Sequence, residues 1–276
     1  YYDVRPGEAA GHPVLLLIGS PMGADGFAAL AARFADRTVV TYDPRGAGRS
    51  LRTDGALVTR VEEHADDLHR IIAALDAGPA DVFASSGGAV NALALTAEHP
   101  EQVRVLVAHE PPAFRVLPDS GPALAVADDL RETYLKSGYG PAMAKFIAFV
   151  GHRGLIPAGY AGQAGPDPAA FGLPADDDGS RDDALLGLNM PWCVEYEHDF
   201  AALRAVSASG RTRIVLGVGQ ESGEMAPGRA AVAVADRLGV APVTFPGGHA
   251  GFVSAEFTGM GGKPDEFAAT LRSVLG

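Results

Sequence analysis

Short apolar runs recur along the chain and alternate with segments whose apolar residues repeat at helical spacing. In the segment 58–76, for example, apolar residues recur every three or four positions, as on one face of a helix. Alternation of this kind predicts a mainly parallel sheet covered by helices on both faces. Strands are expected near 13–19, 37–43, 81–86, 103–110, 212–219 and 240–246, and helices near 26–36, 58–76, 87–98, 226–238 and 264–275.

The alternation is interrupted between Pro112 and Ser209. This stretch has helical periodicity, little strand character, and two helix candidates at about 121–136 and 140–151, before a loop rich in Gly, Pro and Asp. We therefore expect an α/β core into which a helical cap is inserted. The expected bounds are 1–112 and 209–276 for the core and 113–208 for the cap.

One apolar strand ends in a serine between very small residues. A strand that turns abruptly into a helix, with one hydroxyl exposed at the bend, tolerates almost no side chain two positions before or after that hydroxyl. Ala84 and Gly88 meet this condition for Ser86, whereas the alternative Ser85 would require Phe83 at a crowded position. The sequence therefore predicts Ser86 as a nucleophile.

A nucleophilic serine needs a general base, and the chain offers eight histidines. His249 is the candidate because it follows the apolar run Val243–Phe245 and lies in the loop Pro246–Gly251, whose small residues leave the imidazole little steric cover. His109 closes an apolar strand and is expected to be packed. The other histidines are expected to be solvated: His12, His64, His69, His99, His152 and His198.

Four segments together resemble the α/β-hydrolase superfamily over nearly the whole length. They are the strand and turn 14–23, the turn 43–50, the serine elbow around Ser86, and the late Gly-Gly-His that ends at His249. In that superfamily the chain order is nucleophile, acid, histidine, with which Ser86 before His249 agrees. The resemblance implies an α/β-hydrolase fold with a cap and catalysis of acyl transfer.

The resemblance also implies further roles. The oxyanion hole would consist of the backbone N–H groups of Gly87 and Ser20, while Asp43 and Arg45 would hold the turn beside the elbow. Family members usually carry His-Gly at the end of the first of these strands. This chain has Ile18 in place of that histidine, so a hydrogen-bonding side chain behind the oxyanion loop is missing.

Two glutamates are candidates for the acid that would orient His249. Glu221 lies in the loop after the strand 213–218, where the superfamily most often has its acid, although the usual register falls on Ser222. Glu110 ends the preceding strand, a position from which some members take their acid. An unpaired charge at the end of an apolar strand is costly, which favours Glu110. Both alternatives stay open at this point.

Two segments resemble ligand-binding motifs without their spacing. The turn Gly46–Gly48 lacks the third small residue of a dinucleotide fingerprint, because Leu51 occupies that position. The acidic run Asp176–Asp178 lacks the ligand spacing and closing glutamate of a calcium loop and is expected to be a solvated loop. The predicted chemistry requires no metal and no organic cofactor.

Composition limits the classes of partner. The chain has 276 residues, 47% of them hydrophobic, and a net charge of −12 that argues against nucleic acid or an anionic membrane surface. The single cysteine, Cys193, rules out an internal disulfide and suits a reducing, cytoplasmic compartment. No window is apolar enough to span a bilayer, and no secretory signal precedes the first strand. The sequence leaves a homo-oligomer open.

We predict a serine hydrolase that cleaves a carboxylic ester or related acyl bond of an apolar small molecule. Phe146, Trp192 and Met143 are expected to contribute to the substrate pocket. The motifs do not separate ester hydrolysis from perhydrolysis, C–C bond or lactone hydrolysis, or acyl transfer to an alcohol. A non-catalytic ligand receptor is the alternative from a different class, although a binder has no reason to keep both serine and histidine.

Overall fold

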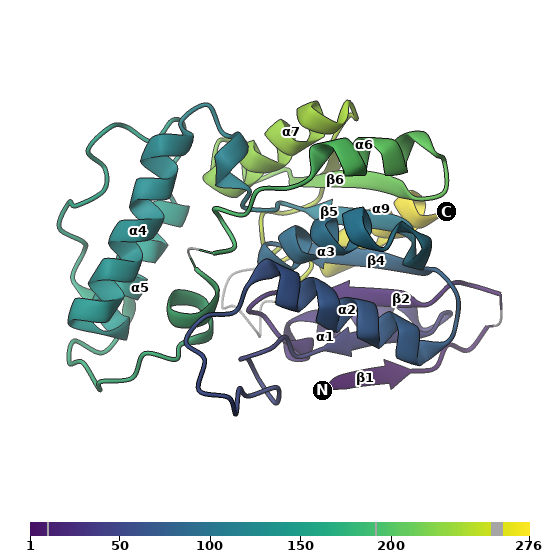
Figure 1. Cartoon of the computed structure of the whole chain (residues 1–276), viewed down its shortest axis with the longest axis horizontal. Coiled ribbons are helices and arrows are strands. Elements are labelled where there is room, and N and C mark those ends of the chain that lie inside the picture. The colour runs from purple at the N-terminus through teal and green to yellow at the C-terminus, as the bar shows by residue number, and fades with distance from the viewer. Residues whose placement is uncertain (10, 191, 255–261) are drawn as a thin grey trace.

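The computed structural model describes residues 1–9, 11–190, 192–254 and 262–276. Its centre is a seven-stranded sheet with the order β1-β3-β2-β4-β5-β6-β7, in which only β1 is antiparallel to its neighbour (Figure 1). The strands are β1 (Tyr2–Arg5), β2 (Leu15–Ile18), β3 (Val39–Tyr42), β4 (Ala80–Ser85), β5 (Val103–His109), β6 (Arg213–Gly219) and β7 (Val243–Phe245).

The predicted sheet is confirmed, with one strand added at its edge. All four residues of β1 are exposed, and Tyr2 and Val4 alternate with Asp3 and Arg5 over too short a stretch to predict a strand by itself. The inner strands consist mainly of buried apolar residues, as expected for parallel strands that are buried on both faces.

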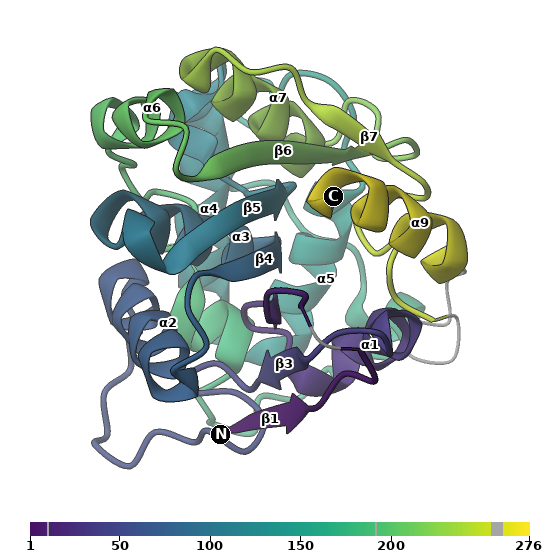
Figure 2. The same cartoon turned by 90° about the vertical axis from the view of Figure 1, so that its right-hand side faces the viewer.

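Helices cover both faces of the sheet (Figure 2). Successive side chains of the inner strands point to opposite faces and pack there into two separate apolar clusters. Against one face lie α2 (Val61–Leu75), α3 (Gly87–Glu98), α6 (Phe200–Ala208) and α7 (Ala226–Leu238), and against the other lie α1 (Ala28–Ala31) and α9 (Pro264–Leu275). The helix expected at 26–36 is three short pieces, with 3₁₀ turns at Ala24–Phe27 and Ala32–Phe34 around α1.

Between β5 and α6, residues 113–199 form what we term the inserted segment. It contains α4 (Ser120–Ser137) and α5 (Tyr139–Val150), which pack together beside the core (Figure 1), followed by a 3₁₀ turn (Pro168–Phe171) and a short π-helix, η6 (Ala184–Asn189). The expected cap ended at 208, but α6 packs on α3 and α7. Its Leu203 is buried in the same cluster as the sheet, so this helix lies with the core.

None of the helices in the described ranges is long and apolar enough to cross a membrane.

Candidate active site

Ser86 lies at the turn between β4 and α3 and has a backbone conformation that residues other than glycine rarely adopt. Its φ is 57° and its ψ is −131°. A residue other than glycine with positive φ costs on the order of 1–3 kcal/mol and persists where its surroundings fix it. Here the backbone N–H of Ser86 donates to His109 O (3.0 Å), and its carbonyl accepts from Ala89 N (2.9 Å). The strained turn presents Ser86 to a cavity.

The turn is so tight because α3 begins in contact with the end of β2. A Cβ on Gly88 would lie 2.7 Å from Ile18 O, and a Cβ on Gly87 would lie 2.6 Å from Ser20 O. Both distances are shorter than van der Waals contact with a backbone oxygen, which cannot move aside independently. Glycine at 87 and 88 is thus required by close packing of helix against strand.

Gly88→Ala should therefore destabilise the protein by about 1–3 kcal/mol, because the added methyl overpacks the contact between α3 and β2. The free energy of unfolding in urea measures the effect. Gly121→Ala is the matched control, since a Cβ there meets no atom within 4 Å and alanine is the better helix former. Equal stability of the two variants would contradict this account of the turn.

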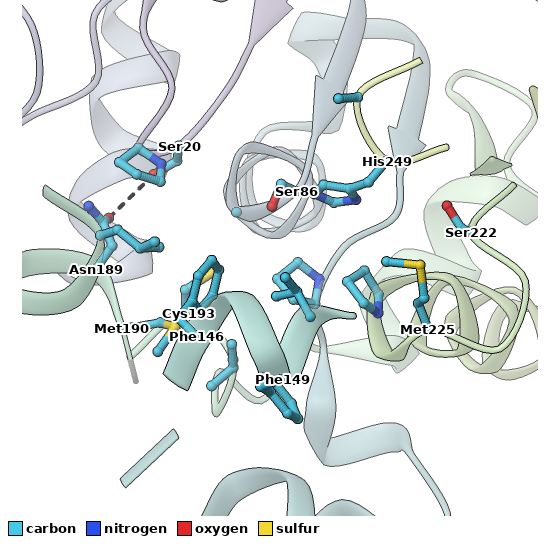
Figure 3. Close-up of a pocket in the computed structure, with 18 of the residues that line it drawn as sticks. Ser20, Ser86, Phe146, Phe149, Asn189, Met190, Cys193, Ser222, Met225 and His249 are labelled. Carbon is cyan, nitrogen blue, oxygen red and sulfur yellow. Dashed lines mark hydrogen bonds between the residues drawn. The ribbon is translucent and has the colours of Figure 1, made fainter. Parts of the chain in front are cut away.

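His249 and Glu110, which are 139 residues apart in the chain, are brought together. The Nδ1 of His249, in the loop after β7, lies 2.7 Å from Oε2 of Glu110, the residue after β5. A carboxylate can only accept, so Nδ1 carries the hydrogen and Nε2 of the neutral ring is left with its lone pair. Ser86 and His249 both line the same cavity (Figure 3).

Glu110 is held in an unusual position. It is fully buried, and its φ of 47° is the second strained non-glycine backbone at this end of the sheet. Its Oε1 accepts from Gly219 N (2.8 Å), and its own N–H donates to Gly217 O (3.0 Å). Burial alone raises the pKa of Glu110, but the hydrogen bond from His249 and the nearby imidazoles outweigh it and lower the pKa to about 2. The carboxylate is therefore ionised throughout the neutral range.

Glu221, the other acid candidate, has a different partner. Its carboxylate is 55% exposed and pairs with Lys263 Nζ at 2.6 Å, at the rim of the cavity. The next residue, Ser222, is buried and lies beside the loop that carries His249, its Oγ 3.8 Å from where a Cβ on Gly248 would be. Of the two glutamates, only Glu110 is hydrogen-bonded to His249 among the described residues.

The cavity in front of Ser86 has a volume of about 440 Å³. It lies between the core and the inserted segment, and Phe146 from α5 lines it. Other apolar walls come from both parts of the chain: Pro112, Phe114, Phe149, Val150, Leu185, Met190, Cys193, Val194, Met225 and Pro227. Burial raises the pKa of the Cys193 thiol to about 12, so this residue is an apolar wall and not a nucleophile.

Two expected pocket residues lie elsewhere. The guanidinium carbons of Arg60 and Arg131 lie 5.2 and 5.5 Å from the centre of the Trp192 ring. Met143 packs against the apolar cluster of the inserted segment. Neither is among the described residues that line the cavity. The prediction was wrong for both because apolar character marks burial but does not say which face of a helix or loop meets the pocket.

Two of the histidines that were expected to be solvated are buried. His64 Nε2 lies 2.7 Å from Asn189 Oδ1, and His198 is enclosed by Tyr196 and Phe200, so that burial lowers its pKa to about 4. For His64 a signal existed, because it lies three residues after Val61, on the apolar face of α2. His109 is packed as predicted, with Nδ1 3.1 Å from Ser85 Oγ, and burial lowers its pKa to about 4.

Ser20, immediately after Gly19 at the end of β2, is buried at the edge of the cavity. Its hydroxyl donates to Oδ1 of Asn189 in the inserted segment (3.3 Å; Figure 3), a residue that sequence reasoning missed because no motif marks it. Gly87, the first residue of α3, has an N–H for which the helix supplies no carbonyl partner.

The turn 43–50 beside the elbow is held by its own ion pairs. Asp43 accepts from Ala24 N (2.9 Å) and from the backbone and side chain of Arg49 (3.1 and 2.6 Å). Arg45 pairs with Asp67 of α2 (2.9 Å between Nε and Oδ2). Both residues make structural contacts here, as the resemblance implied.

Comparisons with known proteins agree with this architecture. Residues 12–150, just over half of the chain, match the family described as alpha/beta hydrolase fold. The chain is 34% identical over 263 residues to the uncharacterized hydrolase YraK of Bacillus subtilis, covering 91% of this chain and 86% of that protein. It is also 34% identical over 109 residues to a putative carbamate hydrolase, RutD, of Caulobacter vibrioides, of which the match covers 40%.

Among solved structures, a thermophilic esterase from Thermogutta terrifontis has the same fold, with a TM-score of 0.66 at 21% identity, over 100% of this chain and 92% of the other. The family match, the similarity to YraK over nearly the full length and the seven-stranded sheet all agree. The chain therefore belongs to the alpha/beta hydrolase family, and its named relatives are hydrolases.

Proposed function

We propose that this protein is a serine hydrolase that cleaves a carboxylic ester, or a related acyl bond, of an apolar small molecule. The observation that carries the proposal is the 2.7 Å hydrogen bond from His249 to buried Glu110. His249 lines the same cavity as Ser86, which lies on its strained turn. A nucleophile, a base and a group that orients the base are the minimum set for this chemistry.

In the proposed reaction, Ser86 Oγ attacks the substrate carbonyl while Nε2 of His249 takes the hydroxyl proton. The tetrahedral oxyanion receives hydrogen bonds from the backbone N–H groups of Gly87 and Ser20, each worth roughly 3–4 kcal/mol in the transition state. Collapse breaks the ester C–O bond, and His249 returns the proton to the departing alkoxide. Water then attacks the acyl-enzyme by the same steps and releases the carboxylic acid. Glu110 stabilises the imidazolium in both halves.

The lining of the cavity supports an uncharged, apolar substrate. Among the described lining residues, Glu221 is the one carboxylate, and its charge is paired with Lys263 at the rim. The uncharged polar side chains of Ser20, Asn189 and Ser222 also line the cavity. A charged acyl group would be desolvated against phenylalanine and methionine side chains without a partner, which is costly.

The test is release of p-nitrophenol from a series of p-nitrophenyl esters and from one p-nitrophenyl carbamate. We expect turnover of the acetate, butyrate and octanoate esters and much slower turnover of the palmitate, whose extended chain is too long for a cavity of about 440 Å³. Turnover of the carbamate alone would be consistent with the serine mechanism but would make the substrate a carbamate instead of a carboxylic ester. If no ester or carbamate is cleaved, a specialised acyl or C–C bond substrate, or a receptor role, replaces this proposal.

A further inference from the structure

We infer that Asn189 is a positioning residue for the oxyanion hole. It lies in the inserted segment, outside the residues that would contact the reacting carbonyl, and it holds the loop that carries Ser20. The inference rests on the proposed serine hydrolase function, because only in that function does the Ser20 N–H receive an oxyanion. The hydrogen bond between Asn189 of the inserted segment and Ser20 of the core would thus affect the rate of catalysis.

The side chain of Asn189 is fixed by three hydrogen bonds. Its Oδ1 accepts from the Ser20 hydroxyl at 3.3 Å and lies 2.7 Å from His64 Nε2, and its Nδ2 donates to Ala184 O within η6. Because Oδ1 can only accept, His64 must carry its hydrogen on Nε2. Burial lowers the pKa of His64, so the ring acts as a neutral donor. Asn189, Ser20 and His64 are all buried.

This network determines where the loop after β2 lies. A buried hydroxyl without a partner costs on the order of 1–3 kcal/mol, so Ser20 is favoured in the position where its hydroxyl reaches Asn189. The side chain and the N–H of Ser20 share one Cα. Holding the hydroxyl therefore restricts the direction in which the N–H points.

The other proposed donor is in contact with the same part of the inserted segment. A Cβ on Gly87 would lie 2.6 Å from Ser20 O and 3.2 Å from Cys193 Sγ. The backbone N–H of Cys193 in turn donates to Asn189 O at 3.0 Å. Both donors thus lie against residues 189 and 193, and a shift of these residues would displace the donors together.

Misplaced donors would affect the transition state more than the bound substrate, since the oxyanion exists only after attack. Loss of the Asn189 contact should therefore lower kcat and leave KM nearly constant. A residue that only binds substrate would raise KM, and a residue that only stabilises the fold would lower the melting temperature without changing kcat of the folded protein.

The experiment compares Asn189→Leu, which keeps the side-chain size and removes its polar atoms, with Ser20→Ala, which removes the hydroxyl and keeps the backbone N–H. We expect each to lower kcat for the best p-nitrophenyl ester by about tenfold, with KM within about twofold. The double variant should lose no more than the stronger single one, because both remove the same hydrogen bond. Ser20→Ala is the smaller change and serves if Asn189→Leu does not fold.

Asp119→Asn is the matched control. It weakens a different contact between the inserted segment and the core, the ion pair of Asp119 with Arg229 of α7, without touching Ser20 or Gly87. Its kcat should stay within about twofold of the wild type even if its melting temperature falls as far as that of Asn189→Leu.

Three results would overturn the inference. They are an unchanged kcat in Asn189→Leu, a rise in KM without a change in kcat, and losses in the double variant that multiply. Ser86→Ala is assayed in parallel, and full activity in that variant would instead reject the serine mechanism. The two failures are thereby distinguishable.

Discussion

Ser86→Ala is expected to lower kcat for every cleaved ester by at least about 10⁴-fold, because the acyl-enzyme can no longer form. Residual hydrolysis would come from the oxyanion hole and substrate binding acting on bulk water. Stability should change little, since alanine has to adopt the same φ of 57° as serine. Kinetics with the octanoate ester and urea unfolding of both proteins measure the two quantities.

Two further variants sharpen this prediction. Ser85→Ala removes the adjacent hydroxyl, which is buried and hydrogen-bonded to His109, and should keep turnover within about threefold. Ser86→Gly should be as inactive as Ser86→Ala but at least as stable, because glycine adopts positive φ without strain. An inactive Ser85→Ala together with an active Ser86→Ala would mean that Ser85, and not Ser86, is the nucleophile.

Glu110→Gln is the second change with a large expected effect, a loss of about 10²–10⁴-fold in kcat. Glutamine keeps the size of the side chain but cannot stabilise the imidazolium, and its amide can favour the wrong tautomer of His249. Glu221→Gln should stay within about twofold of the wild type, because its carboxylate is exposed and paired with Lys263. The reverse ranking of the two variants would make Glu221 the acid.

A stricter test of the acid moves the carboxylate from position 110 to position 222. Ser222 is buried beside Gly248 in the loop that carries His249, and it occupies the register where the superfamily most often has its acid. Introducing Ser222→Asp into Glu110→Gln should recover at least about tenfold in kcat, because a carboxylate again faces the imidazole from that side. Recovery by Ser222→Asp but not by Ser222→Asn would identify charge as the missing property. No recovery by either would contradict this geometry of the site.

The core of the fold could be predicted because its signals are local. The inner strands are mainly apolar runs, and a long helix such as α2 repeats its apolar residues at helical spacing. The elbow at Ser86 was equally visible, because steric exclusion at Ala84 and Gly88 acts within five residues. The edge strand β1 has only a four-residue alternation and no buried residue, and its place depends on pairing with β3.

The site was harder to predict because it is assembled across the chain. Glu110 and His249 are 139 residues apart, and the positive φ that aims Glu110 at the imidazole is not encoded by any neighbouring glycine. Trp192 and Met143 were assigned to the pocket on apolar character alone, which does not give direction. Asn189 carried no signal, because an asparagine in a loop-rich segment gains significance only when Ser20 and His64 are found next to it.

The central claim is that Ser86 is an activated nucleophile, and the most direct measurement is covalent labelling by a fluorophosphonate followed by peptide mass spectrometry. One adduct on Ser86 is expected in the wild type, with no adduct in Ser86→Ala and much slower labelling in Glu110→Gln and His249→Ala, because these residues supply the base that activates the hydroxyl. An adduct on another residue, or equal labelling rates in all four proteins, would contradict the account.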